Sequence, residues 1–152
     1  MNRNRRKILN AAAGTGVLAA SGWFCTVGAH AASWNKSAFD SKAAADAIKN
    51  IGASNLIVSQ DIAITAPDIA ENGAVVPVAV TSRIPNTQSI AIVAEKNPFP
   101  LAASFEVANG AEPYASVRIK MGQTSHVRAI VKADGKFYTA AKEVKVTVGG
   151  CG

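Results

Sequence analysis

The chain has 152 residues, of which 49% are hydrophobic and 17% are charged, with 12 Gly and 6 Pro. This length and composition fit one globular domain with a buried core, and they exclude a disordered chain and a coiled coil. The formal net charge of +6 would favour a nucleic-acid-binding protein, but residues 1–31 carry four of the 16 basic groups and no acidic group. The other 12 basic and 10 acidic side chains nearly balance, so we expect no nucleic-acid partner.

The N-terminus has the pattern of an export signal. Arg5 and Arg6 belong to a charged opening segment, and residues 11–27 are small and apolar. Ala29 and Ala31 then supply the small side chains that a signal peptidase needs before its cleavage point. The paired arginines are typical of a twin-arginine signal, which exports proteins after they have folded.

We therefore predict that residues 1–31 are a twin-arginine-type signal peptide and that the mature protein begins near Ala32 in the periplasm, an oxidising compartment. A membrane anchor is the alternative, but the apolar run contains Gly, Ser and Thr and would span a bilayer poorly. We expect no stable membrane insertion after cleavage. A lipoprotein signal centred on Cys25 is excluded because bulky Trp23 and Phe24 precede that cysteine.

The pattern after the signal predicts one helix followed by short strands. Ser37 and Asp40 resemble a capping box, and the Ala-rich stretch that ends before Gly52 predicts an amphipathic helix over about residues 36–50. Period-two runs rich in Val, Ile and Thr follow, separated by turn formers. The predicted strands cover residues 57–64, 75–84, 89–95, 102–108, 116–121, 125–132 and 137–148.

Asp134-Gly135 is the clearest hairpin turn, because it lies between two such runs. About seven short strands with regular turns, after one short helix, predict an all-β fold. The expected architecture is an immunoglobulin-like antiparallel β-sandwich over residues 32–148, with a flexible C-terminal arm at residues 149–152.

Few residues of the mature chain could support a metal or a cofactor. It contains one His, His126, and one Cys, Cys151, so four ligands at zinc-type spacing cannot be assembled. No Gly-rich loop joins a strand to a helix as a phosphate site requires. We expect no metal and no cofactor, no catalytic residue, and an exposed position for His126 on a strand face.

The C-terminus carries the one feature that suggests chemistry. A predicted strand runs directly into Gly149, Gly150, Cys151 and Gly152. A lone cysteine in a secreted protein indicates an intermolecular partner or a reactive thiol. The flanking glycines make the arm thin and flexible, and at ~3.3–3.6 Å per residue it could extend the sulfur on the order of 10 Å. Such an arm can enter a narrow pocket of another protein, whereas a mobile nucleophile is poorly oriented for catalysis.

The terminal carboxylate is expected to raise the pKa of the Cys151 thiol above its usual ~8.5, so that a receiving enzyme must activate it. The residues by themselves favour a non-catalytic thiol carrier. Two alternatives stay open. One is a structural or assembly module that Cys151 joins to a partner by a disulfide. The other is a thiol enzyme, which would need a fixed base near Cys151, and His126 is the sole imidazole in the mature chain.

Four segments of the mature chain resemble SoxY, the sulfur-carrier family of the periplasmic thiosulfate-oxidising Sox system. The segments are Ala66-Pro-Asp-Ile-Ala-Glu-Asn-Gly-Ala-Val-Val-Pro-Val78, Glu95-Lys-Asn-Pro98, Arg118-Ile-Lys-Met-Gly-Gln-Thr-Ser125 and Lys142-Glu-Val-Lys-Val-Thr-Val-Gly-Gly-Cys-Gly152. Their occurrence in this order, behind a twin-arginine-like leader, is a specific signal. Family tails usually end in Gly-Gly-Cys-Gly-Gly, whereas this chain has a single Gly after the cysteine.

The resemblance implies an immunoglobulin-like fold and a covalent sulfur-carrier cycle on the tail cysteine, here Cys151. It also implies a SoxZ-like subunit as heterodimer partner. A c-type cytochrome enzyme would join thiosulfate to the cysteine as a thiosulfonate, and a hydrolase would then release sulfate and leave a persulfide for sulfur-oxidising enzymes. Phe99, which follows the second segment, could belong to a docking surface or to the core.

Overall fold

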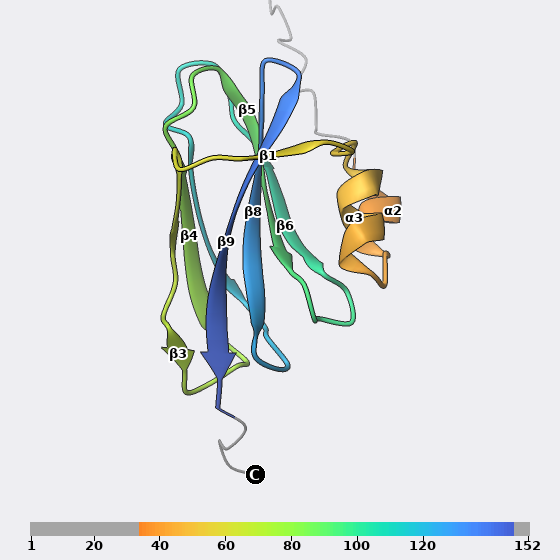
Figure 1. Cartoon of the computed structure of the whole chain (residues 1–152), viewed down its shortest axis with the longest axis vertical. Helices are drawn as coiled ribbons and strands as arrows, with labels where there is room; N and C mark the ends of the chain where they lie inside the picture. The colour runs from red at the N-terminus through yellow and green to blue at the C-terminus, as the bar shows by residue number, and fades with distance from the viewer. Residues whose placement is uncertain (1–33, 148–152) are drawn as a thin grey trace, which may run out of the picture. The chain divides into compact units, whose positions relative to one another are not determined.

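The computed structural model describes residues 34–147, which lie within one compact unit that spans residues 32–152. Two β-sheets pack face to face, and two short helices lie against the outer face of the larger sheet (Figure 1). The predicted all-β, immunoglobulin-like sandwich is confirmed. The predicted signal peptide at residues 1–31 and the predicted arm at residues 149–152 lie outside the described residues.

The strand order separates the two sheets. The larger sheet runs β1-β9-β8-β5-β6, with β3 also paired to β9, and the smaller sheet runs β2-β4-β7. The helices are α2 (Lys36–Phe39) and α3 (Ala44–Asn50). The strands are β1 (Leu56–Val58), β2 (Ile62–Thr65), β3 (Ile69–Ala70), β4 (Val76–Ser82), β5 (Thr87–Ala94), β6 (Leu101–Glu106), β7 (Tyr114–Ile119), β8 (Ser125–Ala133) and β9 (Lys136–Val146).

The β8–β9 hairpin forms at the predicted turn. Asp134 and Gly135 connect the strands with φ angles of 49° and 72°, both in the left-handed region that a two-residue type I′ turn requires. The ladder then pairs Ala133 with Lys136 and continues as far as Ser125 with Val144. This hairpin lies between β1 and β5 in the larger sheet, and its second strand, β9, is the last strand of the described chain.

The main core lies between the two sheets. Alternate residues of β4, β5 and β8 point into it, as the period of two predicts, and their side chains are fully or almost fully buried. They are Val76, Val78, Val80, Ile90, Ile92, Val127, Ala129 and Val131. A second, smaller core lies on the opposite face of the larger sheet, where α2 and α3 contribute Ala38 and Ala47 against Val93, Leu101 and Ile130.

The single helix predicted over residues 36–50 is wrong, because the segment folds as α2 and α3. Asn35, not Ser37, caps the first helix: its Oδ1 accepts the Ala38 amide at 3.1 Å. Ser41 then donates to the Ser37 carbonyl at 2.8 Å, and Asn50 donates to the Ser41 hydroxyl at 3.0 Å. This side-chain network replaces the helical hydrogen bonds of the intervening turn and lets both helices bury an alanine.

The strand predicted over residues 57–64 is also divided. Ser59 Oγ accepts the Asp61 amide at 3.1 Å and turns the chain out of β1, in the larger sheet, into β2, in the smaller one. β1 pairs with β9 in parallel, and so does β3, which the sequence pattern did not reveal. The sandwich is therefore antiparallel except for these two short additions to β9.

Shortening a side chain in the main core should cost a measurable part of the stability. Ile92 has no exposed surface, so Ile92→Val should lower the free energy of unfolding by ~0.5–1.5 kcal/mol through loss of packing. Ile57 is 46% exposed on β1, and the matched change Ile57→Val should stay within ~0.5 kcal/mol of the wild type. Denaturant unfolding measures both, and equal losses would contradict the burial difference.

Candidate functional site: the base of the C-terminal arm

The last residues of β9 lead to the predicted thiol. β9 ends at Val146, Thr147 is the last described residue, and Cys151 follows four positions later in the sequence. Cys151 and the predicted arm residues Gly149, Gly150 and Gly152 lie outside the described residues. The site that can be built is therefore the point from which the arm leaves the sandwich, beside β3 (Figure 1).

On one side, β9 is held by β3. The Lys145 amide donates to the Asp68 carbonyl at 2.9 Å, and the Thr147 amide donates to the Ala70 carbonyl at 3.1 Å. The Thr147 hydroxyl lies 3.4 Å from the carbonyl oxygens of Ala70 and Glu71. These bonds extend the hydrogen-bonded backbone to Thr147, the last described residue.

On the other side, β8 has already ended. Ser125 pairs with Val144 at the close of the β8–β9 ladder, so Val146 has no strand residue opposite it. The hydroxyl of Thr124 takes that position and accepts the Val146 amide at 3.0 Å. A side chain thus continues the hydrogen bonding that the neighbouring strand no longer supplies.

Below β9, the backbone of Gly73 approaches two neighbours closely. A Cβ at this position would lie 2.3 Å from the Met121 carbonyl oxygen and 2.8 Å from Cγ1 of Val146. The Met121 amide donates to the Gly73 carbonyl at 2.7 Å, which holds the two segments at this distance. Only glycine leaves enough space for this contact. We call residues 68–73, 121–125 and 145–147 together the arm base.

The turn after β5, residues 95–100, is hydrogen-bonded to the arm base and to the residue before it. Asn97 Nδ2 donates to the Lys120 carbonyl at 2.6 Å, and the Lys96 amide donates to Ser125 Oγ at 3.0 Å. Lys142 Nζ donates to the Ala66 carbonyl at 2.6 Å and lies 3.0 Å from Asp68 Oδ1. The four segments that carry the family resemblance are therefore joined to one another by hydrogen bonds around the end of β9.

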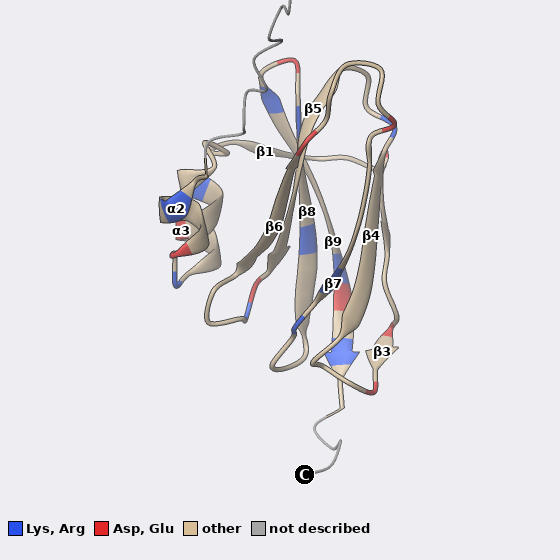
Figure 2. Cartoon of the chain, turned by 180° about the vertical axis from the view of Figure 1, so that it is seen from behind, with Lys and Arg blue, Asp and Glu red and all other residues tan. Residues whose placement is uncertain are grey.

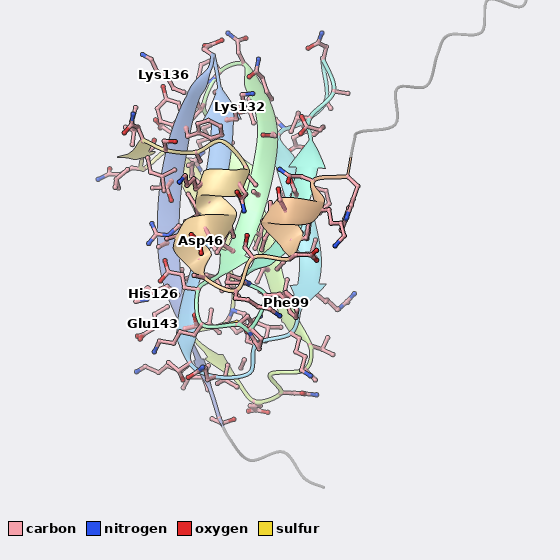
Figure 3. All side chains as sticks on the ribbon, turned by 90° about the vertical axis from the view of Figure 1, so that its right-hand side faces the viewer. Asp46, Phe99, His126, Lys132, Lys136 and Glu143 are labelled. Atoms are coloured by element: carbon pink, nitrogen blue, oxygen red, sulfur yellow. The ribbon has the colours of Figure 1, made fainter. Side chains whose placement is uncertain are left out.

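His126 is exposed on the outer face of the larger sheet, as predicted. Its side chain is 54% exposed, it pairs with Glu143 across the β8–β9 ladder, and the two side chains lie beside each other in Figure 3. Its Nδ1 lies 4.0 Å from Glu95 Oε2, while Arg128 binds Oε1 of the same carboxylate at 2.6 Å. His126 thus lies beside the Glu95–Arg128 ion pair at the surface of the sheet.

The family assignment follows from comparison with known proteins. The sequence profile of the family described as "Sulfur oxidation protein SoxY" matches residues 48–151, which include the whole arm base and Cys151. The chain belongs to the SoxY family. A solved structure, the sulfur carrier protein SoxY from Chlorobium limicola f thiosulfatophilum, is 41% identical in sequence, with a TM-score of 0.60. The match covers 68% of this chain and 96% of that one.

The SoxY family and the structure of a SoxY sulfur carrier together establish the general role of the chain: it is a sulfur carrier of the Sox system. The human F-spondin reeler domain is also similar in structure, at 11% identity and a TM-score of 0.42, over 62% of this chain and 95% of that one. No curated protein sequence matches this chain.

The structure resolves the position of Phe99 in this SoxY protein. Phe99 is 49% exposed, and Lys42 Nζ lies over its ring at 3.4 Å from the centroid, so it is not a core residue. The next two residues are buried: Pro100, and Leu101, which is the first residue of β6. The cation–π contact joins the segment between α2 and α3 to the turn after β5, which is hydrogen-bonded to the arm base.

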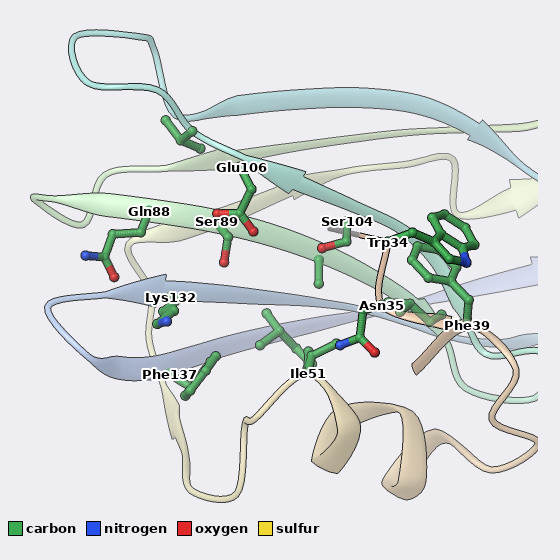
Figure 4. A pocket seen from close by; sticks show the side chains of 14 residues that line it. Trp34, Asn35, Phe39, Ile51, Gln88, Ser89, Ser104, Glu106, Lys132 and Phe137 are labelled. Atoms are coloured by element: carbon green, nitrogen blue, oxygen red, sulfur yellow. The ribbon is translucent and has the colours of Figure 1, made fainter. Parts of the chain in front are cut away.

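A cleft of the described domain lies away from the arm base. It has a volume of about 840 Å³ and opens between the helix pair and the outer face of the larger sheet (Figure 4). Phe137, at the opposite end of β9 from Val146, is among its lining residues, as are Trp34, Phe39 and Lys132. The residues that line it include neither a Cys nor a His.

Within residues 34–147, no cluster of three or more His, Cys, Asp or Glu side chains could hold a metal ion. None of the helices in that part of the chain reaches the length and hydrophobicity needed to cross a membrane. Basic and acidic residues are interspersed over the strands in Figure 2, in keeping with the near balance of charge after residue 31.

Sequence reasoning missed two residues of the arm base. Gly73 follows Asn72 in a pair that is typical of a turn, and the sequence does not show that Met121 lies against its backbone. Thr124 lies in a polar stretch before β8, and its bond to Val146 joins residues 22 positions apart. The family resemblance did include both residues, and it was the one signal that pointed to these segments.

Proposed function

We propose that this SoxY protein holds sulfur intermediates covalently on Cys151, at the end of an arm formed by residues 149–152, and presents them to partner enzymes in the periplasm. The support is the family match, which extends through Cys151, together with a strand that is hydrogen-bonded as far as Thr147. Because the backbone is hydrogen-bonded as far as Thr147, the distance that the Cys151 thiol can extend from the domain is limited by the four residues that follow.

The loading step forms one S–S bond. The Cys151 thiolate joins the outer sulfur of thiosulfate to give a thiosulfonate, and the two electrons released pass to the c-type cytochrome enzyme that catalyses the step. In the next step, a partner hydrolase adds one water, which releases sulfate and two protons and leaves a persulfide anion on Cys151. Sulfur-oxidising enzymes of the Sox system then act on the persulfide.

In this scheme the protein is a substrate of other enzymes, not a catalyst. Its stable partner would be a SoxZ-like subunit in a heterodimer, and residues 1–31 would direct export through the twin-arginine route. The near balance of charge over the mature chain agrees with protein partners and not with nucleic acid. The arm glycines Gly149, Gly150 and Gly152 would allow the thiol to enter recessed active sites.

Intact mass measurement of the mature protein tests the proposal. Protein from the periplasm of cells supplied with thiosulfate should carry additions equal to a sulfur atom or a thiosulfate-derived group, and a reducing agent should remove them. Cys151→Ser should abolish these additions. An unmodified thiol, or only the mass of a disulfide-linked dimer regardless of thiosulfate, would contradict the carrier proposal and favour the structural module. The same measurement locates the N-terminus, which we expect near Ala32.

A further inference from the structure

We propose that Thr124 is a positioning residue, which fixes the point where the arm leaves the sandwich and so sets the reach of the Cys151 thiol. This inference rests on the proposed carrier function. The observation behind it is the 3.0 Å hydrogen bond from the Val146 amide to Thr124 Oγ1, beyond the last residue pair of the β8–β9 ladder.

Successive amides of a strand point to opposite sides, so the end of β9 needs acceptors on both. Lys145 and Thr147 donate toward β3, to the carbonyls of Asp68 and Ala70. Val146 donates in the other direction, where the described structure supplies Thr124 Oγ1 as acceptor. The amides of Lys145, Val146 and Thr147 are therefore all hydrogen-bonded, and of these three bonds only the one to Thr124 lies on the β8 side.

β3 is too small to hold the end of β9 alone. It has two residues, its one strand partner is β9, and Ile69 is 57% exposed. A two-residue strand with an exposed side chain contributes little packing, so its position depends on β9 as much as β9 depends on it. Thr124, by contrast, is half-buried next to Ser125, which is buried and bonded to the Lys96 amide. Thr124 therefore links the end of β9 to the start of β8, which is itself hydrogen-bonded to the turn after β5.

The consequence for the arm is geometric. With Thr147 held, Cys151 is the fourth residue beyond the last hydrogen-bonded residue of the described domain, which is a reach of ~13–14 Å at full extension. If β9 is released after Val144, Cys151 is the seventh residue beyond the held backbone and the reach grows to ~23–25 Å. A longer tether lowers the effective concentration of its end at a docked partner's active site, by roughly two-fold for this change in length.

The test compares Thr124→Val, which removes the hydroxyl and keeps the shape, with Thr124→Ser, which keeps the hydroxyl. Both are made in the full mature protein. Amide hydrogen exchange at Val146 and Thr147 should be roughly five-fold faster in Thr124→Val, since one ordinary hydrogen bond is lost, and close to wild type in Thr124→Ser. Loading with thiosulfate by the c-type cytochrome enzyme should fall roughly two-fold in Thr124→Val and recover in Thr124→Ser.

Alkylation of Cys151 by iodoacetamide distinguishes a change in the reach of the thiol from a change in its chemical reactivity. A small reagent diffuses to the thiol, so its rate does not depend on the reach of the arm. Its rate should be the same in wild type and both variants. Unchanged exchange at Val146 and Thr147 in Thr124→Val, unchanged enzymatic loading, or a loss that Thr124→Ser does not restore would each overturn the inference. Failure of the carrier proposal looks different: wild-type protein itself would then not be loaded, or Cys151→Ser would be loaded as well as wild type.

Discussion

Replacing Cys151 with serine should abolish thiosulfate oxidation that depends on this protein and leave its fold unchanged. A serine hydroxyl cannot form the S–S bond that the loading step requires, so no residual carrier activity is expected. Residues 149–152 follow the last strand of the sandwich, and a change there should move the free energy of unfolding by no more than ~0.5 kcal/mol. Thiosulfate-dependent oxygen uptake by cells that express the variant measures the first effect, and thermal unfolding measures the second.

His126→Ala is the matched control for the thiol-enzyme alternative. His126 is exposed on the outer face of β8, beside the Glu95–Arg128 ion pair, so removing its imidazole should leave thiosulfate oxidation intact. If His126→Ala abolished the activity as Cys151→Ser does, the imidazole would be acting as a base for the thiol, and the carrier interpretation would be wrong. Activity in Cys151→Ser would contradict both interpretations at once.

Gly73→Ala should destabilise the domain strongly. The added Cβ would lie 2.3 Å from the carbonyl oxygen of Met121 and 2.8 Å from Val146 Cγ1, and real Cβ atoms do not approach a backbone oxygen so closely. The backbone must move apart, and the short 2.7 Å bond from the Met121 amide to the Gly73 carbonyl resists that movement. We expect a loss of ~2–4 kcal/mol in the free energy of unfolding, measured with denaturant.

Gly122→Ala is the matched control, one residue after Met121. A Cβ on Gly122 would meet no atom within 4 Å. The hydrogen bond from its amide to Asn97 Oδ1, at 3.3 Å, does not involve the side chain and should persist. The variant should therefore be as stable as wild type, or more stable by up to ~1 kcal/mol because alanine restricts the unfolded chain. A loss as large as that of Gly73→Ala would mean that close contact is not the cause.

Features with a local physical cause could be predicted from the sequence. The alternation of apolar side chains indicated two packed sheets, because a strand exposes successive residues to opposite faces. Asp134-Gly135 predicted the β8–β9 hairpin because both residues tolerate positive φ, and the observed angles of 49° and 72° confirm it. Cys151 is the one cysteine after residue 31 and lies between glycines at the end of a strand pattern, which indicated a carrier thiol; that role remains a proposal.

Features that depend on distant partners were decided by tertiary structure alone. The segment 36–50 divides into two helices because Ser41 and Asn50, nine positions apart, bind each other and both helices must bury an alanine on the sheet. The segment 57–64 divides because its halves pair with strands of different sheets. The arm base depends on Thr124, Gly73 and β3, which meet β9 across 22 to 76 residues of sequence. Hydrogen bonds and close contacts between such remote residues leave no periodic signal in the chain, so only the folded domain brings them together.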